Sequence, residues 1–395
     1  MWSSHSGEVC SLSTTPHING FCDSRFTAVQ EAFVNNFVEH NEIGASVCIE
    51  VDGVAVVDLW GGFSDLQKTK AWQQDQLVNV FSVGKGVTAL VAAQCVDRGE
   101  ISYDTRIVDV WPEFGVEGKE QMTLRDALGH RVALPAIRKP LPPTAMYDWA
   151  LMCDALAAEK PWWSPGLTHG YHVNTFGFLV GEVLRRVTGK SVGTLITERV
   201  STPLSADIFL GCSRELHQRM AKFEWPGSPP TAEPPTGLTE EQLLQYNTYY
   251  NPPGLSGAHT VNTSEWRQAE IPSTNMHASA QGVARMYSVL AHGGTLHGTS
   301  LISQETLSVA TTEVSNGDDR VLGRTSRFAH GFQIPLPERG FGPHLEAFGH
   351  YGAGGSVGFC DPISRVGFGY VMNQMGPRWQ NPRNRALMDA LYQCL

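Results

Sequence analysis

A serine and a lysine three residues apart form the pattern most suited to covalent chemistry, in the segment Phe81-Ser-Val-Gly-Lys85. A serine hydroxyl is a weak nucleophile and needs a base beside it. Positions i and i+3 of a helix share a face, so a helix beginning here would place the Lys85 amine next to the Ser82 hydroxyl. The helix N-terminus would add free backbone N–H groups and partial positive charge near the reacting oxygen. The pattern therefore predicts a serine nucleophile, with a base whose pKa burial can lower.

This Ser-x-x-Lys pattern occurs only once in the chain. It follows a predicted hairpin and begins an amphipathic helix, and the residues after it, Gly86-Val-Thr-Ala-Leu-Val-Ala-Ala, are small and apolar, which suits a buried central helix. The alternative interpretation of the same residues is a helix cap followed by a surface lysine.

Two further segments carry candidate functional groups. In the first, Trp163-Ser-Pro-Gly leads to Tyr171 on a loop ahead of a predicted helix, where the phenol tip could point into a cleft. The second runs from His350 through Gly352 and Ala353 to Gly358, and its many glycines permit close approach of the backbone to a ligand. Taken singly, the first segment could instead hold a structural tyrosine, and the second could be a strand with a glycine-rich turn.

Together the three segments resemble the serine β-lactamase and penicillin-binding-protein superfamily, and most closely its family VIII carboxylesterases, which are related to class C β-lactamases. The resemblance covers nearly the whole chain and includes Val57-Asp-Leu-Trp-Gly-Gly62, Trp111-Pro-Glu-Phe114, Thr123-Leu-Arg-Asp-Ala-Leu-Gly-His130, Gly181-Glu-Val-Leu-Arg-Arg-Val-Thr-Gly189, Phe359-Cys-Asp-Pro362 and Gly369-Tyr-Val-Met-Asn373.

The resemblance implies a role for each motif residue. Ser82 would form the acyl-enzyme, Lys85 would take its proton, and Tyr171 would act as base and then as acid toward the leaving group. The backbone N–H groups of Ser82 and Ala353 would form the oxyanion hole. The implied enzyme is a carboxylesterase that cleaves small carboxylic esters, uses no cofactor and binds no metal.

The chain departs from the β-lactamase pattern at two of these motifs. His350 stands where a Lys-Thr-Gly-type motif has lysine, with Gly352 completing the motif. Val173 occupies the place of an asparagine, and Asn174 lies one residue later. We therefore expect His350, Gly352 and Asn174 to contribute to substrate binding, and expect poor turnover of β-lactams.

The substrate-binding residues also include Trp225, one of several aromatic residues in a predicted lid. No lysine follows Lys222, so no lysine of the C-terminal strands can fix a substrate carboxylate, and small neutral esters are the expected substrates. Arg378 or Arg383 could supply the missing charge instead.

Other functions fit parts of the sequence. Gly354-Gly-Ser356-Val-Gly358 matches the G-x-S-x-G elbow of α/β-hydrolases, but no histidine follows His350 to complete a triad. His169 and His172 are three apart without a nearby carboxylate at a ligand spacing, which disfavours a metal site. An acyltransferase, a β-lactamase or peptidase, and a non-catalytic scaffold of the same fold remain open alternatives.

The composition excludes several classes of protein. The chain has 395 residues and a net charge of −10, and its basic residues form no run, which disfavours nucleic-acid binding. No apolar stretch is long enough to span a membrane, no secretory leader is recognisable, and no two cysteines form a CxxC. We therefore expect a cytoplasmic enzyme whose partner is a small-molecule ester; the oligomeric state is left open.

The elements that must position these residues indicate an α+β fold of the β-lactamase/transpeptidase type. A helix over 26–37 and a hairpin over 45–60 with Asp52-Gly53 at its turn open the chain, and strands over 347–350, 356–360 and 366–372 precede a last helix. We expect residues 1–23 to be irregular, residues 24–99 and 301–395 to form an antiparallel sheet with flanking helices, and residues 100–300 to form a helical domain with a loop-rich lid over 223–280.

Overall fold

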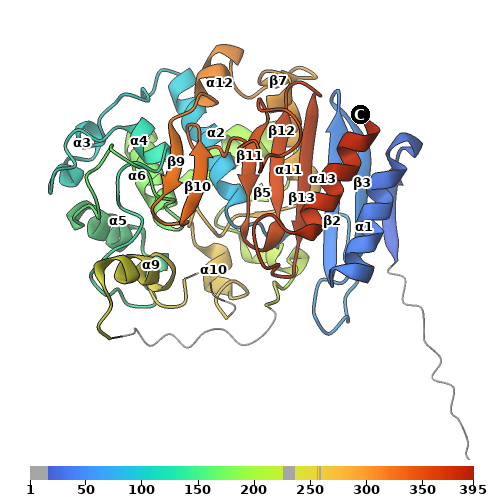
Figure 1. Ribbon diagram of the computed structural model, residues 1–395, viewed down its shortest axis with the longest axis horizontal. Helices are drawn as coiled ribbons and strands as arrows, with labels where there is room; N and C mark the ends of the chain where they lie inside the picture. Colours follow the sequence, from blue (N-terminus) through green and yellow to red (C-terminus); the bar gives the residue numbers. More distant parts are fainter. Residues whose placement is uncertain (1–16, 226–235, 256, 258) are drawn as a thin grey trace, which may run out of the picture.

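A six-stranded antiparallel sheet dominates the computed structural model, which describes residues 17–225, 236–255, 257 and 259–395 (Figure 1). The strand order is β1-β3-β2-β13-β12-β11, so the two ends of the chain meet where β2 pairs with β13. The strands are β1 (Ile18–Cys22), β2 (Gly44–Val51), β3 (Val54–Gly62), β4 (Val78–Asn79), β5 (Ile208–Phe209), β6 (His277–Ala278), β7 (Thr295–Leu296), β8 (Thr299–Ser300), β9 (Ser315–Asp319), β10 (Arg324–Phe328), β11 (Phe348–Tyr351), β12 (Val357–Asp361) and β13 (Val366–Met372).

Helices cover both faces of the sheet and build the rest of the molecule. Figure 1 shows α1 and α13 side by side against one face, and α11 packs across β13, β2 and β12. The helices are α1 (Thr27–Glu39), α2 (Val83–Asp97), α3 (Ile107–Val110), α4 (Leu124–Leu128), α5 (Trp149–Ala158), α6 (Thr175–Thr188), α7 (Val192–Ile196), α8 (Thr202–Leu204), α9 (Glu240–Tyr250), α10 (Ser264–Gln268), α11 (Ala280–Ala291), α12 (Gln304–Ala310) and α13 (Pro382–Cys394).

Local sequence explains the centre of the sheet. Asp52 and Gly53 both have positive φ, 53° and 77°, as the predicted two-residue hairpin turn requires. Gly367 and Gly369 let α11 lie close to β13, because a Cβ at either position would come within 2.5 Å of α11 backbone atoms. The predicted α+β, β-lactamase-like fold class is confirmed.

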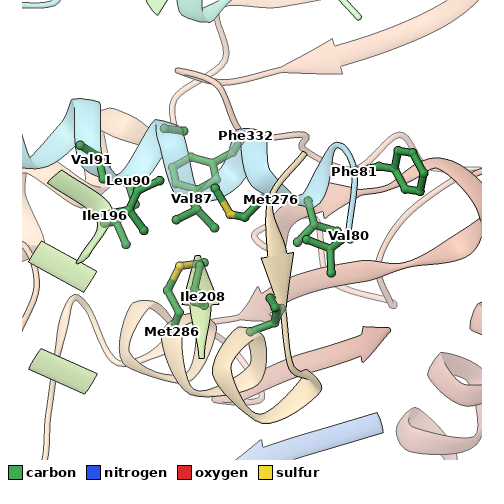
Figure 2. Packing of buried hydrophobic residues seen from close by; sticks show 14 of the residues in the cluster. Val80, Phe81, Val87, Leu90, Val91, Ile196, Ile208, Met276, Met286 and Phe332 are labelled. Atoms are coloured by element: carbon green, nitrogen blue, oxygen red, sulfur yellow. The ribbon is translucent and has the colours of Figure 1, made fainter. Parts of the chain in front are cut away.

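Helix α2 is buried on all sides from Val83 to Cys95, as expected for an apolar helix at the centre of a protein. Figure 2 shows Val87, Leu90 and Val91 of this helix among apolar side chains from other elements, with Val80 and Phe81 at its N-terminal end. The same helix contacts β11 and β12 at the edge of the sheet. The start of α2 is therefore held firmly beside β11.

The structure corrects one prediction about the N-terminus. Within the segment predicted to be irregular, residues 1–23, Ile18–Cys22 form strand β1, which pairs with β3; residues 1–16 lie outside the described part. The cause is the exposed edge of β3, whose free backbone groups bind a further strand whatever its hydrophobic pattern. Gly20 makes this possible, since a Cβ there would meet the Asp58 carbonyl oxygen at 2.0 Å.

The division of the chain at residues 99 and 300 stays a prediction. Helix α11 falls inside the segment predicted to be helical, yet it packs on the sheet. The predicted lid over 223–280 contains α9, α10 and β6 in its described part, whereas residues 226–235, 256 and 258 lie outside it. Among the described residues, no helix is long and apolar enough to cross a membrane.

Candidate active site

Ser82 occupies a sharp turn between β4 and α2. Phe81 has φ = +49°, a left-handed conformation that costs energy for a bulky residue and is typical of functional sites. Its ring packs edge-on against Phe223 at 4.9 Å and Trp225 at 6.1 Å, which holds the turn in place. Val83 N–H donates to Val80 O at 3.3 Å, so the helix begins directly after Ser82. The Ser82 side chain is thus fixed at the helix start with only 5% of the residue exposed.

The Lys85 amine lies beside the Ser82 hydroxyl. Its Nζ is 3.1 Å from Ser82 Oγ, 2.7 Å from Val173 O and 3.0 Å from Ser273 O. Burial lowers the pKa of Lys85 well below its ordinary value, and no carboxylate in the described part forms an ion pair with it. A neutral amine has two N–H groups and one lone pair. The two carbonyls take both N–H groups, so the lone pair is left for the Ser82 O–H.

Tyr171 lies on the same side of Ser82 as Lys85. Its ring stacks on Phe328 at 5.6 Å and meets Trp379 at 5.0 Å, while Lys85 Nζ lies 4.8 Å from the ring centre. Burial raises the pKa of the Tyr171 phenol strongly, and the nearby Ser82 lowers it by less. The buried hydroxyl makes no hydrogen bond of good geometry with the described residues. Tyr171 is therefore a neutral phenol in the free protein.

A buried carboxylate that sequence reasoning missed holds the Tyr171 backbone. Asp319 Oδ1 accepts hydrogen bonds of 2.9 Å from the N–H groups of Tyr171, Val321 and Leu322. Asp319 Oδ2 accepts from Ser326 Oγ at 2.7 Å, and this hydroxyl is also 2.8 Å from His169 Nε2. The β9–β10 hairpin thereby fixes the loop that carries Tyr171.

The histidines near Tyr171 play supporting roles. His172 Nε2 accepts from Leu134 N–H at 3.0 Å, so its other nitrogen carries the proton and donates to Gly170 O at 2.7 Å. Burial lowers the pKa of His172 to about 3. The backbone N–H of His172 donates to His130 Nδ1 at 3.1 Å. Among the described residues no group of three His, Cys, Asp or Glu side chains could hold a metal ion.

The turn between β11 and β12 packs closely against Val80, two residues before Ser82. A Cβ on Gly352 would lie 2.3 Å from Val80 O, so only glycine fits there. Ser356 Oγ donates to the same carbonyl at 3.0 Å, and Ser356 is fully buried. Ser356 is thus a structural donor, which argues against the G-x-S-x-G alternative. Ala353 is brought to the neighbourhood of Ser82 by these contacts.

His350 lies beneath the site rather than in its opening. The residue is fully buried, its Nδ1 is 2.7 Å from Tyr351 O, and its ring centre is 6.0 Å from that of Tyr171. Burial lowers the pKa of His350 to about 3. His350 is therefore uncharged at neutral pH.

The remaining predicted binding residues lie on the lid side of the site. Asn174 is buried, and its Nδ2 donates to Thr248 O of α9 at 2.8 Å, which ties the lid helix to the loop after Tyr171. Trp225 is half-buried and contacts Phe81 and Phe223.

A cavity of about 640 Å³ opens beside the site. Its lining includes Ala353 of the β11–β12 turn together with Phe328 and Trp379, the two rings that contact Tyr171. Tyr249 of α9, in the predicted lid, also lines the cavity. A substrate in this cavity would meet the Ala353 backbone and the aromatic wall around Tyr171.

A serine–lysine pair at the start of a central helix, beside the edge strand of an antiparallel sheet, is the arrangement of the penicillin-recognising hydrolases. The beta-lactamase family model matches residues 29–393, and the chain belongs to this family. A crystal structure of a family VIII carboxylesterase is 38% identical with a TM-score of 0.89, covering 96% of this chain and 100% of that chain. A penicillin-binding-protein homologue from Caulobacter crescentus is also 38% identical, with a TM-score of 0.88 and the same coverage.

A curated relative is the esterase/beta-lactamase LipL of Mycobacterium tuberculosis, 31% identical over 361 residues, which cover 90% of this chain and 83% of LipL. The predicted resemblance to family VIII carboxylesterases is confirmed, as is the predicted enzyme class, a carboxylesterase of the serine hydrolase type.

Proposed function

We propose that this protein hydrolyses small carboxylic esters through an acyl-enzyme on Ser82, with Lys85 as the base and Tyr171 as a proton relay. The observation that carries this proposal is the set of contacts around Lys85. Its burial favours a neutral amine. The two backbone carbonyls accept hydrogen bonds from its two N–H groups, which leaves the lone pair for Ser82 Oγ at 3.1 Å. Such an amine can accept the proton that serine must lose.

In the first half of the proposed reaction, Ser82 Oγ attacks the ester carbonyl carbon while its proton passes to Lys85 Nζ. The carbonyl oxygen becomes an oxyanion, which the backbone N–H groups of Ser82 and Ala353 stabilise. The intermediate collapses, the bond to the alcohol breaks, and the proton returns from Lys85 through the Tyr171 hydroxyl to the leaving oxygen. The raised pKa of Tyr171 suits a phenol that passes a proton on and is not itself ionised.

In the second half, water takes the place of the alcohol. Lys85 takes one proton from water as the water oxygen bonds to the acyl carbon. The bond from that carbon to Ser82 Oγ then breaks, which releases the acid, and Lys85 returns the proton to Ser82 Oγ. Every step uses groups of this chain, so no cofactor is needed. The partner in this proposal is a small-molecule ester, and the predicted cytoplasmic location belongs to the same proposal.

Loss of the nucleophile tests the proposal. Ser82→Ala should lower kcat for p-nitrophenyl butyrate by about 10³-fold or more without unfolding the protein, because it removes a single oxygen. Ser356→Ala is the matched control, and it should keep both ester hydrolysis and labelling by a fluorophosphonate probe. Labelling that persists in Ser82→Ala and disappears in Ser356→Ala would overturn the assignment. A wild-type protein that neither labels nor hydrolyses any ester would be a scaffold.

Two comparisons separate the remaining alternatives. Nitrocefin should be turned over much more slowly than a short p-nitrophenyl ester, because Val173 stands where the β-lactamase pattern has asparagine and the uncharged, buried His350 stands where it has lysine. Product analysis with added alcohols or amines should show the free acid as the main product. Predominant transfer to the added acceptor would indicate an acyltransferase.

A further inference from the structure

The cavity beside the active site carries a concentration of positive charge. Four arginines line it, Arg324, Arg327, Arg339 and Arg378, and its lining contains no aspartate or glutamate. The whole chain, by contrast, has a net charge of −10. The charge of this cavity is therefore opposite to that of the molecule, as expected where a site selects anions.

Two of the four arginines already have a carboxylate partner within the protein. Arg327 pairs with Glu313 and donates to Pro335 O at 2.9 Å. Arg339 lies 3.4 Å from Glu338 and donates to Thr325 O at 3.3 Å.

Arg324 and Arg378 differ from them. In residues 17–225, 236–255, 257 and 259–395, neither guanidinium forms an ion pair or a hydrogen bond. Both side chains are exposed to solvent. Desolvation and the like charges of Arg339 and Arg378 lower the pKa of Arg324 from its ordinary value, and the Asp319 carboxylate opposes part of this shift. Bringing like charges together costs energy that a bound anion would offset.

The Trp379 ring contacts both Arg324 and Tyr171, the proposed proton relay. The Arg324 guanidinium lies 5.2 Å from the centre of the Trp379 ring, and that ring lies 5.0 Å from the Tyr171 ring. The guanidinium is therefore no farther from the Tyr171 ring than these two distances added. Ala353, the proposed oxyanion donor, lines the same cavity. An ester whose carbonyl lies beside Ala353 would reach into the cavity that Arg324 and Arg378 line.

We propose that the preferred substrates are esters that carry a free carboxylate, which Arg324 and Arg378 bind while the ester group lies at Ser82. A planar guanidinium binds a carboxylate through two parallel hydrogen bonds. The apolar side chains of Leu322, Ile334 and Phe341 would contact the hydrocarbon between the two groups. This inference rests on the proposed ester hydrolysis, and it replaces the expectation of neutral substrates drawn from the absence of a C-terminal lysine. Of the two arginines considered from the sequence, Arg383 is excluded, because it is buried against Glu42.

Matched esters test this proposal. One pair compares p-nitrophenyl butyrate with the p-nitrophenyl monoester of glutaric acid, which places the carboxylate on the acyl side. The other pair compares p-nitrophenyl butyrate with its derivative that carries a carboxylate at position 3 of the ring. This derivative places the carboxylate on the alcohol side of the ester. In at least one pair the wild-type protein should favour the anionic ester by about 10–100-fold in kcat/KM, mainly through KM, as expected for charge-assisted hydrogen bonds.

Substitution of the arginines should remove this preference. Arg324→Gln and Arg378→Gln should each lower the ratio of anionic to neutral kcat/KM about tenfold or more, and Arg324→Lys should lower it less. The matched control is Arg327→Gln combined with Glu313→Gln, which removes a compensated ion pair and should leave the ratio unchanged. A ratio near one in the wild type, unaffected by the substitutions while the neutral esters are hydrolysed, would overturn this inference and leave the proposed function intact. No hydrolysis of any ester would instead contradict the proposed function.

An inhibition experiment tests the same proposal with the wild-type protein alone. Glutarate should inhibit hydrolysis of p-nitrophenyl butyrate competitively and more strongly than the uncharged valeramide, and added salt should weaken the inhibition. Equal inhibition by the two compounds, or inhibition independent of salt, would contradict binding of the carboxylate by the arginines.

Discussion

In the proposed reaction the Lys85 amine serves Ser82 only without its proton, and the burial of Lys85 favours that state. The side chain is fully buried, and both carbonyls that bind it belong to the backbone and carry no full charge. Removing an ammonium ion from water costs several kcal/mol unless it is paired, so the folded protein favours the neutral amine. The low pKa values of His172 and His350, about 3 each, mean that no histidine charge competes there at neutral pH.

The first prediction concerns pH. Because burial lowers the pKa of Lys85, the amine should be neutral well below pH 10.5 and active there. Activity should be lost as pH falls through this lowered pKa, since the protonated amine cannot accept a proton. The measurement is kcat/KM for a neutral ester from about pH 5 to 10. An acid limb centred near the ordinary lysine pKa of ~10.4 would contradict the proposed state of Lys85.

The second prediction concerns the coupling of Lys85 to Tyr171. Lys85→Ala and Tyr171→Phe should each lower kcat by about 10²-fold or more, because each interrupts the same proton path. The double variant should be little worse than the poorer single variant, as is typical of groups that act as a unit. Steady-state kinetics of the four proteins measures this directly. Losses that multiply would show that the two residues act independently.

Only site residues that are close in sequence could be predicted to lie together without the family resemblance. Ser82 and Lys85 share one helix turn, so their spacing alone predicts their contact. Tyr171 could be assigned only through the family resemblance. Asp319 gave no signal, because its bond to the Tyr171 N–H joins positions 148 residues apart and only the fold brings them together.

At the scale of elements, the β9–β10 hairpin acts as a support for the Tyr171 loop. Its Asp319 carboxylate accepts four hydrogen bonds, three of them from backbone N–H groups. Arg324, which lines the cavity, begins β10 of the same hairpin. One short hairpin thereby positions both the proposed proton relay and a proposed substrate-binding charge.

The third prediction follows from this support. Asp319→Asn keeps an oxygen for the three N–H groups but presents an amide where Ser326 Oγ donates, so we expect a loss of about tenfold in kcat with little change in KM for p-nitrophenyl butyrate. Asp319→Ala should lose at least tenfold more, because it leaves buried N–H groups without an acceptor. A change in KM alone, or equal losses in both variants at unchanged melting temperature, would contradict a positioning role.

At the scale of the whole molecule, the two ends of the chain build one sheet around the inserted central segment. The strands over 44–62 and 357–372 were predictable, because their apolar runs and hairpin turn are local signals. The pairing of β1 with β3 was not predictable, because an edge strand forms where a neighbouring strand has free backbone groups and needs no hydrophobic pattern of its own. The packing of α11 on the sheet also depends on glycines of β13, some eighty residues farther along the chain.

A buried ion pair joins these two ends close to the active site. Arg383 of α13 donates to Glu42 at 2.7 Å, and it also donates to Gly354 O at 3.2 Å and to Gln374 O at 2.9 Å. Tyr370 donates a further hydrogen bond to Glu42. Both charged side chains are almost completely buried, so each depends on the other for compensation. The pair thus connects the segment before β2, the C-terminal helix and the turn that carries Ala353.

The last prediction tests this connection. Arg383→Met should lower the free energy of unfolding by about 3–5 kcal/mol, because it leaves the Glu42 carboxylate buried without its cation. Adding Glu42→Gln should recover part of the loss, since the amide is far less costly to bury. The control is Arg106→Ala, which removes an exposed pair with Asp109 and should cost about 0–1 kcal/mol. Urea unfolding, followed by tryptophan fluorescence and by ester hydrolysis, gives the midpoints of the wild type and the three variants. If Arg383→Met costs no more than Arg106→Ala, the ends of the chain are held by the sheet pairing between β2 and β13 and not by this ion pair.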